Sequence, residues 1–557
     1  MKKFGRKSLS VMLAGVLAVS ALTFTGCGGG SATDPAAESG LVDTDVKGSI
    51  DIMTWGGDSK YYEDLGGQDI SPSKLTSSTL AQHYAVAKAF KEHYPNVKIN
   101  LWAKSGDPNQ PGTPSWSQEM ENFKADHGKY PDIWGVTDLC ADIEKGLVAD
   151  LSVYKKEDSY KAYNKGLMDN MNYYGMQAAL PSYSIPWGIW INKALATKNN
   201  IDVPSEDWTI DEFVDFISQG DNKTFWGIKH AATDPAGHDG HGPLDIVNMG
   251  VDTINKQIKE ENSIDLNNEQ VKSMLKYLTK IAAASIDTAM GKEELSADIA
   301  KENKGYSWSF FCNNRTLVNC EDPWYLTAGA DDSAKDSGVY INSTDWDFYP
   351  FPSTEYNDNC IRLVVDPIAL HNYAADDGNN DWSKKEKAKL DLAYTYATYM
   401  TASTEAKQAV FDQKWTENGA KKNSAANDSF PVVTGDAYND QMDIWNSHPA
   451  HKVYKDKKGF QKVVKLFKEG KSWDYIDKCW TKTVKENGED KDTLFEWRNC
   501  NSEDVAGAWM TDKNWGDQVK SKLADWTETI NKRIDKAQAT FKEALKKYYG
   551  KTDADFK

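Results

Sequence analysis

The stretch Leu180–Lys193 reads LPSYSIPWGIWINK, and it decides the organisation that we expect for the whole chain. Its second part, Ile185–Ile191, is rich in branched and aromatic residues and has no charged residue, which predicts a buried strand. Pro181 and Pro186 lack a backbone N–H donor and stiffen the chain, which suits the entrance of a sheet or a hinge better than the middle of a strand. We therefore expect the chain to cross here between two lobes.

Three large aromatic residues lie in this stretch, namely Tyr183, Trp187 and Trp190. Side chains near a crossing between lobes would face a cleft, and clefts of this kind usually bind small ligands. Tyr183 and Trp187 are therefore candidate ligand contacts. Trp187 and Trp190 could equally belong to the core, because most large aromatic side chains serve packing.

The beginning of the chain has the pattern of an export signal. Residues 1–7 are cationic, Leu9–Leu22 is apolar, and small residues lead to Cys27. The segment resembles a bacterial lipoprotein signal, in which residues 1–26 are removed and the cysteine becomes lipidated. Residues 27–47 would then form a flexible tether on the extracytoplasmic face of the cell membrane. An uncleaved anchor helix is the alternative, and it leaves the protein on the same side.

Composition excludes some classes of partner. Loss of residues 1–26 removes four positive charges and moves the formal net charge from −18 to −22. The sequence has no basic stripe of the kind that binds nucleic acid, so nucleic acid is disfavoured as a partner. This acidity favours a soluble monomer. The roughly 530 remaining residues exceed what one hydrophobic core comfortably holds, so two large lobes are expected.

Six cysteines follow Cys27, and they allow fifteen pairings. The pairs that are near in sequence are Cys312 with Cys320 and Cys479 with Cys500, whereas buried reduced thiols are the alternative. No two of the six have the CxxC spacing of a structural zinc site.

Strand and helix patterns alternate after residue 48. The expected elements are a strand at 49–55, a helix at 79–93, a strand at 97–102, a helix at 114–125 and a third strand that ends near 138. Such alternation predicts a mostly parallel sheet that is covered on both faces. Ligands of these sheets bind beyond the carboxyl ends of the strands, where Trp55, Asp58, Thr137 and Asp138 are placed by this pattern.

Several short motifs follow one another between residues 48 and 435. They are Trp55-Gly-Gly-Asp58, Tyr-Pro-Asp-Ile at 130–133, Gly146–Leu151, Leu180-Pro181 ahead of Asn192-Lys193, Asp207–Phe213, Phe311–Asn319 with Pro323-Trp324, Trp346–Pro352 and Leu390–Phe411. No single motif is specific. Their order resembles the extracellular solute-binding proteins of ABC importers, family 1, the maltose-binding-like carbohydrate binders.

The resemblance implies a two-lobe α/β fold of the periplasmic-binding-protein kind. Each lobe would be a mostly parallel sheet flanked by helices, with residues 48–186 and 353–430 in the first lobe. Residues 187–345 and 431–557 would form the second lobe, including a helical C-terminal extension. The resemblance also implies that hinge closure traps a sugar, for which we expect an oligosaccharide. The protein would then deliver this sugar to a two-subunit membrane permease.

Carbohydrate chemistry gives separate support. Pyranose rings pack their apolar C–H faces on aromatic planes, and their hydroxyls both donate and accept hydrogen bonds. The candidate stacking residues are Trp55, Tyr183, Trp187 and Trp324, and the candidate polar contacts are Asp58, Lys60, Thr137 and Asp138. Local alternatives exist, because Asp58 could only stabilise a turn, Lys60 could be solvated and Asp138 could cap a helix.

Other readings of the sequence are weaker. A secreted glycoside hydrolase would use a similar aromatic cleft with two carboxylates, and a binder of peptides or another solute would use extended backbone contacts. The sequence contains no nucleophile elbow, phosphate-binding loop or HExxH motif, so we expect no enzyme activity and no cofactor. His238 with His241 and residues 376–381 lack the ligand pattern of a metal site, so no metal is expected. The tryptophan-rich segment 471–515 has no assigned role.

Overall fold

A computed structural model describes most of the chain after residue 40. The described residues are 41–55, 60–104, 116–135, 139–229, 263, 265, 267–291, 295–302, 309–320, 325–331, 335, 340–376, 382–474, 483–486, 489–492 and 515–556. They belong to one compact unit, Ser39–Lys557. The predicted lipidation site Cys27 and the histidines 238 and 241 lie outside the described residues.

The larger sheet has seven strands. Its order is β14 (Ser472–Asp474), β11 (Ile361–Leu370), β4 (Ile133–Gly135), β1 (Gly48–Trp55), β3 (Val97–Lys104) and β2 (Lys60–Tyr62), and β7 (Leu180–Trp187) pairs with β11 outside this path. The strands β3 and β4 are both parallel to β1, as the alternating pattern predicts. By contrast, β11 is antiparallel to both β4 and β7, so the sheet is mixed.

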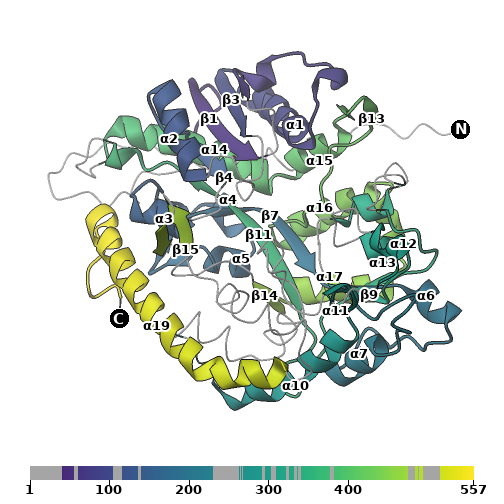
Figure 1. Ribbon diagram of the computed structural model, residues 1–557. Coiled ribbons are helices and arrows are strands. Elements are labelled where there is room, and N and C mark those ends of the chain that lie inside the picture. Colours follow the sequence, from purple (N-terminus) through teal and green to yellow (C-terminus); the bar gives the residue numbers. More distant parts are fainter. Residues whose placement is uncertain are drawn as a thin grey trace, which may run out of the picture. The chain divides into compact units, whose positions relative to one another are not determined.

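Helices with clear sequence signals cover this sheet. The helix α1 (Ser78–His93) begins after Ser77, whose hydroxyl accepts a hydrogen bond from the Leu80 N–H at 3.2 Å. It packs against α14 (Lys384–Ala402) and α15 (Thr404–Asp412), and Figure 1 shows these three helices close to β1 and β3. The predicted helix at 79–93 and the strand at 49–55 are confirmed.

The smaller sheet has three antiparallel strands, β10 (Asp347–Tyr349), β8 (Ile189–Ile191) and β9 (Val318–Asn319). The α/β fold class is confirmed, but the expectation of a mostly parallel second sheet differs from the structure. The reason is that β8 directly continues β7 and β10 leads into β11. The antiparallel pairing of β7 with β11 therefore runs on into the pairing of β8 with β10.

The chain passes between the two sheets at Gly188, which lies between β7 and β8 within Leu180–Lys193. A Cβ atom at Gly188 would collide with the carbonyl oxygen of Tyr349 at the end of β10. A Cβ atom at Gly459, in α17 (Lys458–Lys468), would collide with the Tyr349 ring. Glycine is therefore needed at two places where neighbouring segments approach closely.

Helices α6 (Lys193–Lys198), α7 (Ile210–Ile217) and α10 (Glu269–Ala283) follow the crossing. The remaining elements are α2 (Trp116–His127), α3 (Leu139–Glu144), α4 (Asp158–Lys161), α5 (Lys165–Asp169), β5 (Asn172–Tyr173), β6 (Met176–Gln177), α11 (Ile286–Gly291), α12 (Ala297–Ala300), α13 (Ser309–Cys312), β12 (Trp415–Glu417), β13 (Ala420–Lys422), α16 (Gly435–Ser447), β15 (Thr483–Glu486) and β16 (Glu489–Asp492). A capping box of Thr209 and Glu212 begins α7.

The C-terminal part of the chain contacts both sheets. Strand β14 pairs with β11 of the larger sheet, whereas α17 packs against β10 of the smaller one. The long helix α19 (Trp515–Tyr549) contacts both α3 and α10, as the yellow helix in Figure 1 shows. At 1.5 Å per residue it is about 50 Å long, which is enough to reach both. Residues 431–557 are therefore not confined to the second lobe, in contrast to the sequence-based boundary.

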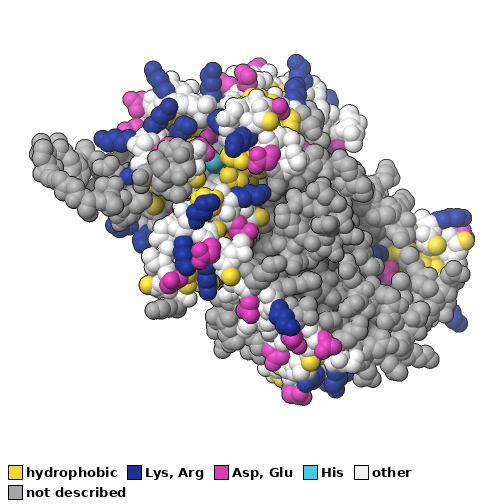
Figure 2. All heavy atoms as spheres, turned by 60° about the vertical axis from the view of Figure 1, so that its left-hand side comes forward, with side chains coloured by type: hydrophobic (Ala, Val, Ile, Leu, Met, Phe, Trp, Pro, Cys, Tyr) yellow, Lys and Arg dark blue, Asp and Glu magenta, His cyan; other side chains and the backbone are white. Residues whose placement is uncertain are grey.

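The described surface, helices and cysteines bear on three further expectations. On the face shown in Figure 2, the described Lys and Arg side chains are interspersed with Asp and Glu, and they form no continuous basic strip there. Within the described part of the chain, no helix has the length and apolar character to cross a membrane. Cys140, Cys312, Cys320 and Cys360 are buried thiols, so Cys312 and Cys320 do not form a disulfide. The other candidate pair, Cys479 with Cys500, lies outside the described residues.

Candidate functional site

A cavity of about 380 Å³ lies at the edge of the larger sheet. Thr54 and Trp55 at the end of β1 and Gly135 at the end of β4 line it. These are the carboxyl ends of neighbouring parallel strands, the position where ligands bind in sheets of this kind. The volume lies at the lower end of the range of about 300–1,000 Å³ that is usual for small-molecule pockets.

The ribbon of β7 and β11 forms the next part of the wall. Tyr183 of β7 and Asp366 of β11 are partners in the antiparallel register, and both line the cavity. The register shifts between Asp366 and Pro367, and such a bulge redirects side chains at the edge of a sheet. Here β4 has already ended at Gly135, so the ribbon extends beyond its neighbour and is open to the cavity.

Two helix beginnings complete the polar wall. The first turns of α1 contribute Gln82 and His83, and the first turns of α15 contribute Lys407. Each helix begins with a serine cap, Ser77 for α1 and Ser403 for α15, so the chain direction at both helix starts is fixed locally.

The loop 427–432 closes one side of the cavity and is held by several hydrogen bonds. The Phe430 N–H donates to Ser184 O at 2.6 Å, and the Ser184 N–H donates to Ser429 Oγ at 3.0 Å. Lys407 Nζ donates to Ser429 O at 2.8 Å, and Asn427 Nδ2 donates to the Gln82 side chain at 3.3 Å. The loop is thereby tied to β7, α15 and α1 at once.

The surroundings shift the pKa values of three ionisable side chains in the cavity wall. Desolvation by the cavity walls raises the pKa of Asp366 to about 6, although its side chain is exposed to the cavity. Burial lowers the pKa of Lys407 to about 8 and that of His83 to about 4. At neutral pH the wall therefore offers one carboxylate, one ammonium and one neutral imidazole, which is a mixture of acceptors and donors.

Two of the predicted ligand contacts lie at the cavity. Trp55 and Tyr183 both line it and are both partly exposed. Lys104 Nζ lies 5.5 Å from the centre of the Trp55 ring, which holds the indole from one side. Lys60 does not line the cavity. It is exposed on the edge strand β2, where its Nζ lies 4.9 Å from the Tyr62 ring, so the solvated alternative describes it.

Trp187 is a core residue in this structure. Only 1% of its surface is exposed, and the guanidinium carbon of Arg362 lies 4.7 Å from the centre of its ring. It does not line the cavity, so the packing alternative describes it. The predicted contacts Asp58, Thr137, Asp138 and Trp324 lie outside the described residues and stay predictions.

Sequence reasoning missed several residues of the wall. Gln82, His83, Asp366, Lys407 and Asn427 come from helix beginnings, an antiparallel strand and a distant loop. The rule that ligands bind beyond the carboxyl ends of parallel strands could not identify these residues, because none of them lies at such a strand end. Only α1 gave a signal, since Ser77 marks the beginning of a helix in the segment that follows β1.

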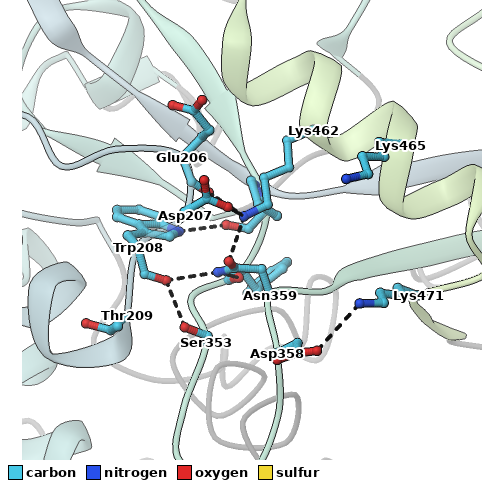
Figure 3. Close-up of polar contacts among 12 residues, drawn as sticks. Glu206, Asp207, Trp208, Thr209, Ser353, Asp358, Asn359, Lys462, Lys465 and Lys471 are labelled. Atoms are coloured by element: carbon cyan, nitrogen blue, oxygen red, sulfur yellow. Dashed lines mark hydrogen bonds and ion pairs between the residues drawn. The ribbon is translucent and has the colours of Figure 1, made fainter.

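A second polar cluster lies where the chain returns from the smaller to the larger sheet, in the segment between β10 and β11 (Figure 3). Lys462 Nζ of α17 donates to Asn359 Oδ1 at 2.7 Å and to Glu206 O at 3.1 Å, and it forms an ion pair with Asp207. Asn359 Nδ2 in turn donates to Trp208 O at 2.9 Å. These contacts fasten the segment that joins β10 to β11 onto the loop before α7, so the segment and the loop are held together.

Metal binding has no support in the part of the chain that the structure describes. There, no three His, Cys, Asp or Glu side chains gather in a way that could hold a metal ion. The polar groups of the cavity are instead a single carboxylate and a single imidazole with amides, hydroxyls and an ammonium.

No protein-family model matches the sequence, and a search of curated proteins finds no match either. Solved structures, however, match the fold along most of the chain. An ABC substrate-binding protein of Listeria monocytogenes, in complex with cycloalternan, has a TM-score of 0.52 and 14% identity over 88% of this chain and 100% of its own. This chain has the fold of the family 1 extracellular solute-binding proteins.

Two further solved structures share this solute-binding fold. A family 1 extracellular solute-binding protein of Alicyclobacillus acidocaldarius has a TM-score of 0.50 and 10% identity, covering 90% of this chain and 100% of its own. A maltodextrin-binding protein of L. casei without ligand has a TM-score of 0.52 and 13% identity, covering 88% and 99%. At these identities the likeness shows the fold, and the ligand has to be argued from the cavity.

Proposed function

We propose that this protein is the substrate-binding subunit of an ABC importer and that it captures a carbohydrate in the cavity beside β1 and β4. The observation that carries the proposal is the combination of two aromatic side chains, Trp55 and Tyr183, with polar groups from strands, helices and the loop 427–432 around one cavity of about 380 Å³. Aromatic planes and a mixed set of donors and acceptors are what a sugar ring requires.

The expected binding mode follows from the wall. The C–H face of a sugar ring would pack on Trp55 or Tyr183, which removes apolar surface from water. Its hydroxyls would donate to Asp366 and accept from Lys407 and from the amides of Gln82 and Asn427. Each of these four side chains lines the cavity.

The number of carboxyl groups in the cavity wall favours a binding protein over a glycosidase. A glycosidase needs two carboxyl groups about 5–10 Å apart at the scissile bond. Asp366 is the only Asp or Glu among the described residues that line the cavity. The protein is therefore proposed to hold its ligand without cleaving it, and a hydrolase remains the alternative that the experiment below tests.

The importer role rests on the sequence pattern together with the fold. Relatives in fold are named as an ABC substrate-binding protein with cycloalternan and as a maltodextrin-binding protein. The pattern of residues 1–27 supports attachment through a lipid on Cys27 on the extracytoplasmic side. The tether expected from the sequence ends before residue 47, because the Val42 N–H donates to Thr395 Oγ1 at 3.1 Å and Val42 and Val46 pack against the core. A monomer would close around its sugar and present the closed form to a two-subunit permease.

A thermal-shift screen tests the proposal. The chain without residues 1–27 is heated with neutral mono- and oligosaccharides, and peptides and metal ions serve as controls. A sugar at about a hundred times its Kd adds roughly 2.7 kcal/mol of stability. We expect a clear rise in Tm with at least one sugar, recovered intact. Recovered fragments would favour the hydrolase, and a rise with peptides alone would contradict a carbohydrate ligand.

A further inference from the structure

We propose that Asp366 determines the ligand class, in that its carboxylate accepts hydrogen bonds from hydroxyls of an uncharged sugar and excludes sugar acids. This inference rests on the proposed function and specifies the substrate of the same cavity. It is carried by the position of Asp366 and by the chemistry of the groups around it.

The backbone around Asp366 is built to present this side chain. Asp366 is the cross-strand partner of Tyr183, and the register shift that follows it precedes Pro367. Ser182 Oγ donates to the carbonyl oxygen of Asp366 at 2.8 Å, which fixes the backbone at the bulge. The side chain is exposed to the cavity, next to an aromatic ring that could support a sugar face. A ring packed on Tyr183 would thus bring its edge hydroxyls towards Asp366.

The carboxylate is available to a ligand. Within the described part of the chain, the Asp366 side chain forms no hydrogen bond or ion pair with another residue, whereas other polar groups of the wall do. An ionised carboxylate has about four acceptor positions and no donor. A ligand that brings hydroxyl donors would satisfy it, and hydrogen bonds to a charged acceptor are stronger than those between neutral groups.

The other charged groups of the cavity do not neutralise Asp366. Lys407 directs its Nζ to Ser429 O on the loop, and the neutral imidazole of His83 carries no charge at pH 7. Tyr183 is a neutral phenol. A sugar acid would therefore place its own carboxylate in a small cavity that already holds one, and like charges at close range repel each other. A neutral sugar avoids this repulsion and keeps the hydrogen bonds.

The test compares two ligands and three proteins. The neutral sugar that stabilises the wild type most and the corresponding uronic acid are titrated by calorimetry into wild type, Asp366→Asn and a control, Asp443→Asn. Asp443 is an exposed aspartate of α16 outside the cavity wall. Thermal unfolding without ligand confirms that each variant is folded.

We expect the wild type to bind the neutral sugar at least tenfold more tightly than its acid. Asp366→Asn should bind the neutral sugar about tenfold more weakly, because a charged acceptor is replaced by a neutral amide, and its preference over the acid should shrink. The control should behave as wild type. Unchanged sugar affinity in folded Asp366→Asn, or a wild type that binds the acid as well as the neutral sugar, would overturn this inference alone. A wild type that binds no sugar would overturn the proposed function, and this inference with it.

Discussion

Two cross-strand pairs of the β7–β11 ribbon, four residues apart, serve opposite purposes. At one end Tyr183 faces Asp366, and both side chains line the cavity. At the other end Trp187 faces Arg362, and these two are 1% and 0% exposed. Each pair combines one aromatic with one charged residue. The local sequence is similar in kind, so the difference in role arises from what covers each end.

Neighbouring strands explain the difference. At Arg362 the ribbon is extended by β14, whose Trp473 is the register partner of Arg362. The crossing to the smaller sheet at Gly188 follows directly after Trp187. At Asp366 the ribbon has a bulge, and β4 on its other side ends at Gly135. A strand pair therefore supplies a buried anchor where it is covered and lines the cavity where its neighbour stops.

Removing the anchor should have the largest effect. Trp187→Ala leaves a cavity in the core and uncovers the Arg362 guanidinium, so we expect a loss of about 3–5 kcal/mol in the free energy of unfolding. Urea denaturation measures this loss. Affinity for sugar should stay within about twofold of wild type, measured where the variant is still folded. A folded Trp187→Ala protein that no longer binds sugar would mean that Trp187 is a ligand contact after all.

Removing an aromatic side chain of the cavity should weaken sugar binding and leave the stability nearly unchanged. Trp55→Ala should weaken sugar binding roughly tenfold to a hundredfold, because packing an aromatic face on a sugar buries apolar surface worth about 1.5–3 kcal/mol. Calorimetric titration measures this change, and the unfolding free energy should change little because Trp55 is partly exposed. Trp102→Ala on the neighbouring strand β3 is the matched control, since Trp102 is also partly exposed but does not line the cavity. Equal losses of affinity in both variants would argue against a stacking role for Trp55.

The polar cluster at the segment between β10 and β11 should contribute less than the tryptophan anchor. Lys462→Met removes the hydrogen bond to Asn359 and the ion pair with Asp207 (Figure 3). We expect the free energy of unfolding to fall by about 1–2 kcal/mol, because the lysine is largely buried while its acidic partner is exposed. Lys465→Met on the same helix is the control, since 71% of the Lys465 side chain is exposed. If both variants unfold at the same urea concentration as wild type, the cluster does not hold this segment.

A change of pH should have the smallest effect, and it should act only at the cavity end. Asp366 has a pKa of about 6, above the usual value of 3.8. Hydroxyl donors favour its ionised form, so sugar affinity should be nearly complete only above about pH 7 and fall severalfold as the pH drops from 7 to 5.

The other ionisable groups that line the cavity keep their charge state over this range, whereas Asp428 of the loop 427–432, whose pKa burial raises to about 7, also titrates within it. Lys407 of α15 has a pKa of about 8 and stays protonated, and His83 of α1 has a pKa of about 4 and stays neutral. Burial raises the pKa of Tyr183 well above 10. Calorimetry at several pH values measures the dependence, and Asp366→Asn should lose it. A pH dependence that persists in Asp366→Asn would assign it to another group.

Much of the fold could be predicted because its signals are local. The buried run at Ile185–Ile191 predicted strands at the crossing, and β7 and β8 lie there. The first strand and helix were predicted from their apolar pattern, and the position of Trp55 at the cavity was predicted because it lies at the carboxyl end of a parallel strand. The relative directions of the strands in the smaller sheet could not be predicted in the same way. They depend on which distant segments of the chain pair with each other.

By itself the sequence determined the order of strands and helices, the helix caps at Ser77 and Thr209, and the edge of the sheet at which Trp55 lies. Those features depend on residues within a few positions of each other. Only the tertiary structure decided that Tyr183 meets the cavity while Trp187 meets Arg362, and that α19 contacts both α3 and α10. Burial is set by whichever segment covers a side chain, and here those segments lie up to hundreds of residues away in the chain.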